Sequence, residues 1–300
     1  MAGRRRKPGG VHQSAAIDLA VMDDVCKVSV VVLTFNEAIN IERCLESVAW
    51  SDDVVVVDSG STDGTGEMAE ALGARVVTRR FDNFANQRNF ALDSANLKHE
   101  WVLHLDADEI VSSELRAEIR GVVRGASGMA AYFVPSRLMM GSKWLRHSGM
   151  YPSYQARFGR RDRLRFQMIG HGQREVLELA EMGTLRGHLL HFNFSKGMSD
   201  WIGKHARYAR DEAAAIIAVP NDSRVIDLFR ATSALERRRV WKGLSRRMPA
   251  RPLAKFLYVY VLRLGFLDGL AGLRYAALMG LYEWLIDANI TEELERKRAR

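Results

Sequence analysis

Three carboxylates end the segment EWVLHLDADEI, in which the apolar run 101–105 is followed by Asp106, Asp108 and Glu109. Carboxylates this close repel one another and raise one another's pKa. A compensating positive charge is therefore expected beside them. Two aspartates at i and i+2 can bind one divalent cation, Mg²⁺ or Mn²⁺, and leave positions open for phosphate oxygens. The alternative is that Asp106 caps a turn while Asp108 and Glu109 are solvated.

Two earlier apolar runs also end in polar residues. KVSVVVLTF is followed by Asn36 and Glu37, and VVVVDSGSTDGT carries Asp58 after a run of valines. The Asp58 carboxylate can accept hydrogen bonds from a base or a ribose, and the Ser, Thr and Gly residues behind it permit close backbone approach. The alternative is a structural loop in which Asp63 caps the next helix.

These polar residues need elements that bring them together. Up to residue 108, β-branched runs alternate with the helically spaced segments NEAINIERCLESV, GEMAEALGA and FANQRNFALDSA. This alternation predicts an α/β fold with βαβ units and a mainly parallel sheet covered on both faces. Ligands bind such sheets beyond the carboxyl ends of the strands, so the polar strand ends are expected to meet at one edge.

The periodicity weakens after Glu109. AAYFVPSRLMM, QARFGRR and HLLHFNF predict strands that form a platform beside the first sheet, and SDWIGKHARYARDEAAAIIA predicts a helix with Ser199 as its N-cap. His191 lies at the end of one of these apolar strands. It is a candidate third metal ligand or phosphate contact, with a buried core histidine as the alternative.

The composition is that of a globular protein with a net charge of +8. This excess makes an anionic partner plausible: nucleic acid, nucleotide phosphates or anionic lipid. Cys44 is expected in the core of a helix and Cys26 in a poorly structured lead-in, with no disulfide between them. No Walker A or dinucleotide-binding motif follows a strand, which disfavours kinases and dinucleotide enzymes. Neither a signal peptide nor a membrane-spanning helix is expected.

Four segments resemble the donor half of glycosyltransferase family 2, in this order and spacing: VVVLTFNEAINIERCLESV, VVVVDSGSTDGT, FDNFANQRNFAL and WVLHLDADE. The later segments GHGQREV, HLLHFNFSKGMSDWIGKHARYARDEA and GFLDGLAGL resemble lipopolysaccharide-core glucosyltransferases and related surface-polysaccharide enzymes. The resemblance spans residues 28–285. It implies a GT-A fold that transfers a sugar from a nucleotide diphosphate with inversion. A UDP-sugar is the favoured donor, with GDP and dTDP left open.

The resemblance also implies roles for the residues that bind the nucleotide sugar. Thr34 and Glu37 would lie beside the base. Asp58 would bind the base or the ribose, and Arg88 in NQRN would contact the base or the diphosphate. Asp106 would approach both the ribose and the metal.

A divalent metal, Mg²⁺ or Mn²⁺, is the implied cofactor, with Asp108 as its chief ligand. The metal would stabilise negative charge as the diphosphate departs. We expect that the metal, with its nucleotide, also supplies the positive charge that compensates the three carboxylates. Inversion also requires a base to accept the proton of the acceptor hydroxyl. Glu175 is the favoured base and His171 the alternative, while an ion pair of Glu175 with Arg174 or Arg165 is the purely structural interpretation.

The C-terminal third is basic and then apolar. Residues 237–255 hold eight basic residues and no acidic one, and the aromatic-rich apolar stretch 253–286 adjoins them. A solvated helix face, nucleic-acid binding and contact with an anionic bilayer are the three interpretations. The adjoining apolar stretch favours the bilayer. Packing on the catalytic domain or a dimer interface is the competing view.

The expected organisation is a flexible basic tail (1–26), a GT-A catalytic domain (27–225) and a helical extension (226–300). The leading hypothesis is a metal-dependent, inverting glycosyltransferase of cell-envelope polysaccharide or lipopolysaccharide synthesis. It would act on a saccharide or lipid-linked acceptor, in the cytoplasm, peripherally on the inner membrane.

Three other functions remain open from the sequence. A polyprenyl-phosphate glycosyltransferase would need no base, because its acceptor phosphate is already ionised. A sugar-nucleotide binder without catalytic activity is a further alternative. A basic nucleic-acid-binding protein is disfavoured, because three acidic strand ends would repel a phosphate backbone, and no nucleic-acid partner is expected.

Overall fold

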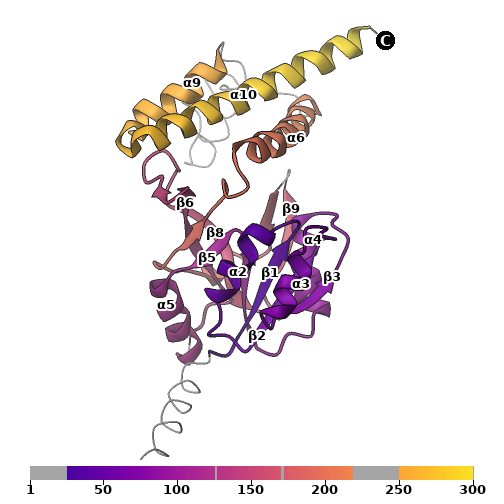
Figure 1. Ribbon diagram of the computed structural model, residues 1–300, viewed down its shortest axis with the longest axis vertical. Coiled ribbons are helices and arrows are strands. Elements are labelled where there is room, and N and C mark those ends of the chain that lie inside the picture. Colours follow the sequence, from indigo (N-terminus) through magenta and orange to yellow (C-terminus); the bar gives the residue numbers. More distant parts are fainter. Residues whose placement is uncertain (1–25, 126, 170–171, 219–249, 300) are drawn as a thin grey trace, which may run out of the picture.

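The computed structural model describes residues 26–125, 127–169, 172–218 and 250–299. Nearly all of the predicted tail, His171 and most of the basic cluster lie outside these ranges. The described residues form two layers (Figure 1). An α/β layer holds the sheet and its covering helices, and a layer of long helices lies beside it.

Four parallel strands form the first half of the main sheet, in the order β3-β2-β1-β4: β1 (Val28–Thr34), β2 (Asp53–Asp58), β3 (Arg75–Thr78) and β4 (Trp101–Asp106). They are connected by α2 (Ala38–Glu46), α3 (Thr65–Ala71) and α4 (Phe84–Ser94). Every residue of β1 is buried. Val30 and Val32 enter one core cluster and Val31 and Leu33 the other, so β1 is covered on both faces, as its β-branched run predicts.

The second half of the sheet is mixed. Beyond β4 follow β8 (Ser153–Arg160), β6 (Ala131–Met140), β12 (Leu189–His191) and β5 (Glu109–Val111). The short strands β7 (Lys143–Trp144) and β11 (Met182–Thr184) also pair with β6. The strands expected in the platform are therefore confirmed, and β6 and β8 are antiparallel.

The chain connection between β4 and β5 shows that this sheet is curled. The two strands are four places apart in the sheet order, yet only Ala107 and Asp108 connect them. Four strand spacings on a flat sheet amount to roughly 19 Å. Three residue steps reach at most about 11 Å. The sheet must therefore curl back on itself, which brings β5 and its partner β12 beside the end of β4.

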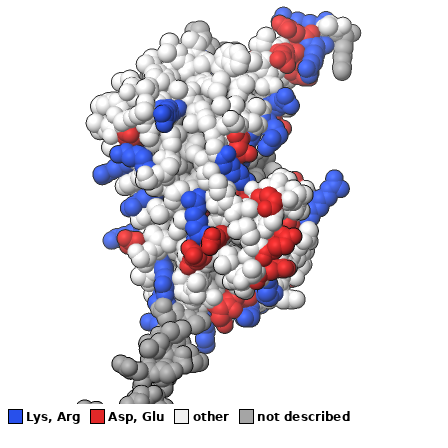
Figure 2. Space-filling model, in the orientation of Figure 1, with Lys and Arg blue, Asp and Glu red and all other residues white. Residues whose placement is uncertain are grey.

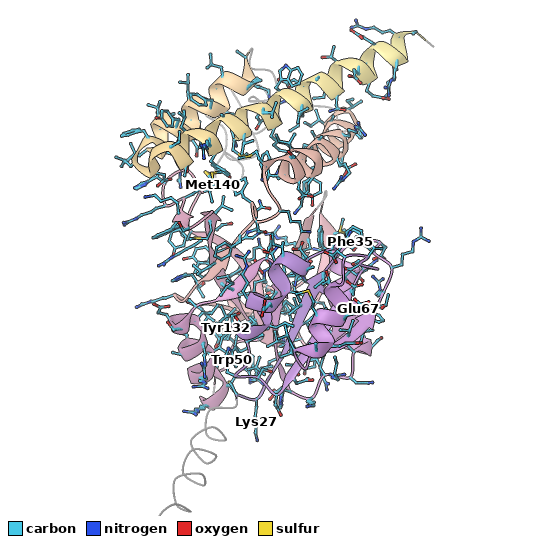
Figure 3. All side chains as sticks on the ribbon, viewed as in Figure 1. Lys27, Phe35, Trp50, Glu67, Tyr132 and Met140 are labelled. Atoms are coloured by element: carbon cyan, nitrogen blue, oxygen red, sulfur yellow. The ribbon has the colours of Figure 1, made fainter. Side chains whose placement is uncertain are left out.

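The remaining elements of the α/β layer lie around this sheet. Helix α5 (Ser113–Arg124) begins after Ser112, whose side chain accepts a hydrogen bond from the backbone of Leu115. Strands β9 (Phe166–Ile169) and β10 (Gly172–Glu175) form a separate antiparallel pair, followed by the 3₁₀ turn η1 (Leu179–Glu181). Side chains such as Trp50 and Tyr132 fill the core of the layer (Figure 3).

The helical layer consists of α6 (Met198–Ala218), α9 (Arg251–Leu257), the π-turn η2 (Tyr258–Leu262), the 3₁₀ turn η3 (Gly265–Asp268) and α10 (Gly269–Arg298). Helix α10 packs along both α6 and α9. In this packing the imidazole of His205 stacks on Trp201, with 3.5 Å between the ring centroids, and meets Tyr282 edge-on, with 5.4 Å between the centroids. Helix α6 thus packs against the predicted extension, although the sequence placed it in the catalytic segment.

Two details differ from the sequence expectations. Helix α6 begins at Met198, so the prediction of Ser199 as its N-cap is wrong. Cys26 is not in a poorly structured lead-in, because its side chain is buried in the core and its backbone donates to Trp50. The predicted core position of Cys44 is confirmed.

Among the described residues, no single helix has the length and apolar character to cross a membrane. One pair of segments, Arg251–Leu262 and Gly265–Arg298, satisfies that test only when both are taken together, and it is bent by 71°.

Candidate active site

Two buried arginines hold the carboxylates at the end of β4. Arg88 on α4 donates to Asp106 Oδ1 at 2.7 Å, and Arg157 on β8 donates to Asp106 Oδ2 at 2.6 Å. Arg157 also donates to Glu109 Oε1 at 2.8 Å, and Glu109 Oε2 accepts the backbone N–H of Asp106. Both carboxylate oxygens of Asp106 are therefore occupied by guanidinium groups.

This arrangement determines the charge state of the cluster. Burial would raise the pKa of Asp106, but the charges of Arg157 and Arg88 outweigh it and hold that pKa well below its usual range. Burial raises the pKa of Glu109, an effect that Arg157 only partly offsets. Burial and the neighbouring Arg157 lower the pKa of Arg88 to about 10, so Arg88 still carries its charge at neutral pH.

Asp108 has a different partner. Its Oδ2 lies 3.2 Å from His191 Nε2 at the end of β12. Burial alone would lower the pKa of His191, but Asp108 outweighs it and raises that pKa to about 9. The curl of the sheet produces this contact, because His191 pairs with Glu109 in the β12–β5 ladder. The structure thus brings together two residues that are 83 positions apart in the sequence.

These contacts test how well a divalent metal fits the site. Asp108 offers a carboxylate oxygen to a cation that takes its other ligands from phosphate oxygens, whereas His191 is protonated at neutral pH and could ligate only after losing its proton. Asp106 fits the metal role less well, because both of its oxygens bind arginine. Within the described ranges, no group of three or more His, Cys, Asp or Glu side chains is placed to hold a metal ion.

The source of the compensating charge therefore needs correction. A positive charge beside the strand-end carboxylates was expected, and the structure contains it, but Arg88, Arg157 and His191 supply it rather than a metal alone. Arg157 was missed as a functional residue. It lies in QARFGRR, which the sequence identified only as a strand, and only the pairing of β8 beside β4 shows its role.

Asp58 shapes the loop that follows β2. Its Oδ1 accepts from Thr34 Oγ1 at 2.8 Å, and its Oδ2 accepts the backbone N–H groups of Gly60 and Ser61 at 2.9 and 2.8 Å. Asp63 accepts the backbone N–H of Thr65, the first residue of α3. The loop is thus ordered by its own carboxylates, and Thr34 lies beside Asp58 as the parallel register of β1 and β2 requires.

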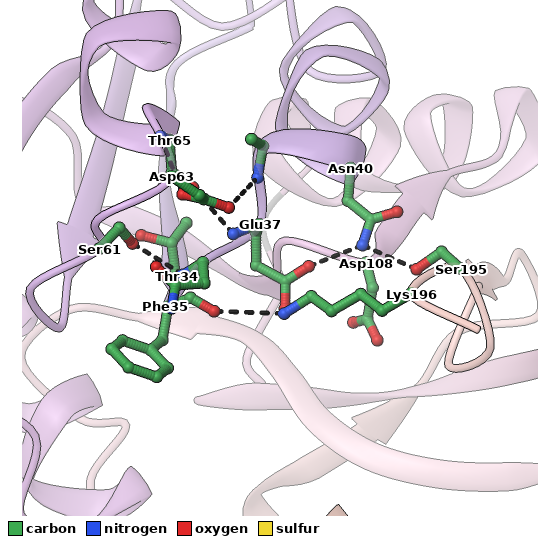
Figure 4. A network of polar contacts seen from close by, with 12 residues as sticks. Thr34, Phe35, Glu37, Asn40, Ser61, Asp63, Thr65, Asp108, Ser195 and Lys196 are labelled. Carbon is green, nitrogen blue, oxygen red and sulfur yellow. Dashed lines mark hydrogen bonds and ion pairs between the residues drawn. The ribbon is translucent and has the colours of Figure 1, made fainter. Parts of the chain in front are cut away.

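Glu37 faces a loop from far along the chain. Its Oε1 lies 2.6 Å from Lys196 Nζ, and its Oε2 accepts from Asn40 at 2.6 Å. Ser195 accepts a second hydrogen bond from Asn40, and Lys196 also donates to the carbonyl of Phe35 (Figure 4). Ser195 and Lys196 therefore connect the loop after β12 to the end of β1. Their role was not predicted from the sequence.

A pocket of about 590 Å³ lies beside this cluster and has the size of a small-molecule site. Arg88, Asp106 and Glu175 all line it. Tyr208 of α6 lines it too, so the helical layer contributes to its wall. Aromatic side chains supply much of the apolar lining: Phe84, Phe133, Tyr154 and Phe166.

Glu175, at the end of β10, is half-buried and lies 3.8 Å from the side chain of Arg174. Both residues line the pocket. The ion pair with Arg174 therefore does not remove Glu175 from the pocket wall. The alternative base, His171, lies outside the described residues. Of the predicted ligands, Asp108 and His191 form their own pair, while Thr34, Glu37 and Asp58 form the networks at the neighbouring strand ends.

Comparison with known proteins identifies the family that the N-terminal half of the described chain matches. Residues 29–174 match the model of glycosyl transferase family 2. This segment is a family 2 glycosyltransferase domain. Over these residues the resemblance seen in the sequence is confirmed, and the fold has the form expected of the GT-A class, a parallel half-sheet continued by a mixed half and followed by C-terminal helices.

Individual relatives match only part of the chain. An uncharacterized glycosyltransferase of Rickettsia bellii is 46% identical over 94 residues, which are 31% of this chain and 31% of that protein. The lipopolysaccharide core biosynthesis glycosyltransferase LpsC of Rhizobium meliloti is 25% identical over 170 residues, 55% of this chain and 62% of LpsC. The chain therefore spans about a third of the Rickettsia protein and less than two thirds of LpsC.

Among solved structures, glucosyl-3-phosphoglycerate synthase from Mycobacterium tuberculosis in complex with phosphoglyceric acid is 19% identical. The match covers 73% of this chain and 88% of that one, with a TM-score of 0.45.

Proposed function

We propose that this protein is an inverting glycosyltransferase that moves a sugar from a UDP-sugar to a saccharide or lipid-linked acceptor of the cell envelope. The observation that carries the proposal is the pocket at the carboxyl ends of the parallel strands, lined by Arg88, Asp106 and Glu175. Family 2 membership of the surrounding domain and the partial match to LpsC support it.

Arg88 and Arg157 would bind the anionic part of the donor. Each uses its Nη2 to hold Asp106, while its Nε and Nη1 are buried and have no hydrogen-bond partner in the described part of the chain. A buried donor without an acceptor costs about 1–3 kcal/mol, so these groups favour an anion that enters beside them. Arg88 lines the pocket directly and would contact the diphosphate, with Arg157 behind it.

A divalent cation is part of this proposal. Asp108 would hold Mg²⁺ or Mn²⁺, together with His191 once the ion displaces the proton from its imidazole, and diphosphate oxygens would complete the coordination. When bound, the ion would act as a Lewis acid that stabilises the departing diphosphate. Asp106, fixed by two arginines, would position Arg88 rather than serve as a principal metal ligand.

Glu175 would accept the proton of the acceptor hydroxyl. It lies on β10 and lines the same pocket as Arg88 and Tyr208. The nucleotide base would lie toward the networks of Thr34, Glu37 and Asp58. A polyprenyl-phosphate acceptor is the second candidate, since an acceptor that is already ionised would not use Glu175.

The proposal also places the protein peripherally on the cytoplasmic face of the inner membrane, where a nucleotide sugar and a lipid-linked acceptor would meet. A saccharide acceptor would not require that location.

Calorimetric titration of UDP into the full chain, with Mn²⁺ and then with EDTA, tests the donor site. We expect metal-dependent binding that is weakened about 10- to 100-fold or more in Asp108→Asn. Asp52→Asn is the matched control, because Asp52 is a partly exposed carboxylate just before β2, at the opposite end of the strands, where it pairs with His99. Failure of UDP, GDP and dTDP alike to bind would overturn the proposal.

A further inference from the structure

The corner between α9 and α10 exposes apolar side chains. Here the chain bends by 71°, and we call residues 261–270 the apolar corner. Leu262 is 74% exposed, Leu267 54% and Leu270 61%. Their neighbours Val261, Leu264 and Phe266 are exposed as well. So many large apolar side chains exposed within ten residues indicate an interaction surface.

The apolar corner is a fixed structure and not a frayed end. A Cβ on Gly272 would lie 2.0 Å from the carbonyl oxygen of Gly265, so the chain can pass itself here only because glycine is present. Asp268 is buried and accepts the backbone N–H groups of His147 and Ser148 at 3.0 and 2.8 Å. It also accepts the Ser148 hydroxyl at 2.7 Å. The corner is therefore fastened to the loop that follows β7.

Along the chain on either side of the apolar corner, the exposed charged side chains have one sign. Between residues 251 and 282 the only acidic residue is Asp268, which is buried. Arg251 and Lys255 lie against acidic residues of α10, whereas Arg274 is exposed beyond the corner and Arg263, which is partly buried, lies within it. The face of the helical layer seen in Figure 2 carries few charged side chains before the mixed cluster at the far end of α10.

We propose that the apolar corner is a docking surface that inserts into an anionic lipid bilayer, with Arg263 and Arg274 at the level of the headgroups. An apolar wedge flanked along the chain by basic side chains, with no exposed acidic residue between 251 and 282, is complementary to hydrocarbon beneath anionic headgroups. A protein partner matched to the same surface would have to present both apolar and acidic groups. The docking surface is inferred from the exposed side chains alone. Its role, which is to hold the enzyme at its acceptor, rests on the proposed function.

Docking at this corner would fix the orientation of the pocket. Helix α10 begins at the corner and packs along α6, and α6 supplies Tyr208 to the pocket wall. The Asp268 contacts connect the corner to the α/β layer at His147 and Ser148. A bilayer bound to the corner would therefore hold the pocket at a fixed position relative to a lipid-linked acceptor.

Flotation of the full chain with vesicles tests the surface. Vesicles of phosphatidylcholine with and without phosphatidylglycerol are compared at low and high salt. We expect the wild type to bind the anionic vesicles, and the Leu262→Asp/Leu270→Asp double variant to bind them at least about tenfold more weakly. Leu72→Asp is the matched control, since Leu72 is a 45% exposed leucine at the end of α3 in the α/β layer, and it should bind like the wild type.

Three results would overturn the docking surface. The first is a wild type that fails to float with anionic vesicles, and the second is a double variant that binds as well as the wild type. The third is a double variant that changes the oligomeric state, or lowers the melting temperature, without changing vesicle binding, because another copy or another segment of the chain would then cover the corner. No donor is present in the assay, so its failure is distinct from failure of UDP to bind.

Discussion

The strand-end carboxylates and the apolar corner both place side chains where they are costly. At the end of β4, charged groups are buried, and at the corner apolar groups face water. The first cost is offset within the chain, because Arg88, Arg157 and His191 reach the carboxylates from α4, β8 and β12. At the corner, no described segment covers the exposed leucines. A cost offset internally needs no partner outside the chain, whereas a cost left open points to one.

The same contrast exists inside the cluster. The carboxylates of Asp106 and Glu109 are paired, but Nε and Nη1 of Arg88 and of Arg157 have no acceptor among the described residues. In the cluster, the carboxylates thus have their cations, while some of the arginine N–H donors have no acceptor. The cluster is therefore suited to receive an anion, just as the apolar corner is suited to receive an apolar surface.

Removal of Arg157 should break the internal compensation most severely. Arg157→Met leaves Glu109 without its cation and Asp106 with only one, and we expect a loss of about 3–5 kcal/mol in the free energy of unfolding by urea. Arg163→Met is the control, because Arg163 pairs with Glu181 at the surface and should cost less than about 1 kcal/mol. Equal effects of the two variants would show that the buried cluster contributes nothing special.

Glu175 tests which acceptor the pocket serves. Glu175→Gln keeps the size of the side chain but removes the base, so transfer to a hydroxyl acceptor should fall about 10²- to 10⁴-fold in kcat while UDP binding is unchanged. The measurement is a steady-state transfer assay beside the calorimetric titration. Nearly full activity would instead favour a phosphate acceptor, which is already ionised.

Asp268 tests the connection between the two layers. Burial would raise the pKa of Asp268, but hydrogen bonds from Ser148 and His147 lower it. Asp268→Asn should therefore cost about 1–3 kcal/mol at neutral pH. Because the native pKa is lowered, this contribution is complete above the unfolded value of about 3.9 and is lost as the pH falls through the native value.

The unfolding free energies of the wild type and of Asp268→Asn should therefore differ at pH 7 and become equal in strong acid. Urea unfolding of both at several pH values measures the difference. A difference that persists unchanged at the lowest pH would contradict an ionised Asp268 as the source of the stability.

The Lys196–Glu37 contact should have the smallest effect on stability. Both side chains are partly exposed, so Lys196→Met is expected to change the unfolding free energy by less than about 1 kcal/mol. The same variant should weaken UDP binding if the nucleotide base lies at this loop. A loss above about 2 kcal/mol in thermal or urea unfolding would instead make the Ser195–Lys196 loop a structural fastening of β1.

The sequence predicted the parallel half of the fold well because its signals are local. A run of β-branched residues predicts a strand that is buried on both faces of a sheet. Strand β1 is the clearest case, because its alternate side chains enter the two core clusters. The meeting of Thr34 with Asp58 followed from parallel pairing alone. The prediction for Ser199 failed because a helix start depends on the preceding turn, which periodicity does not reveal.

Local sequence patterns predict the alternation of strands and helices, the carboxylates at the strand ends and the need for positive charge beside them. The source of that charge depends on how the strands pair in the folded chain. Arg157 meets Asp106 because β8 pairs with β4, and His191 meets Asp108 because the sheet curls. Both contacts join residues more than 50 positions apart, and long-range pairing of this kind depends on sheet topology, which no local pattern encodes.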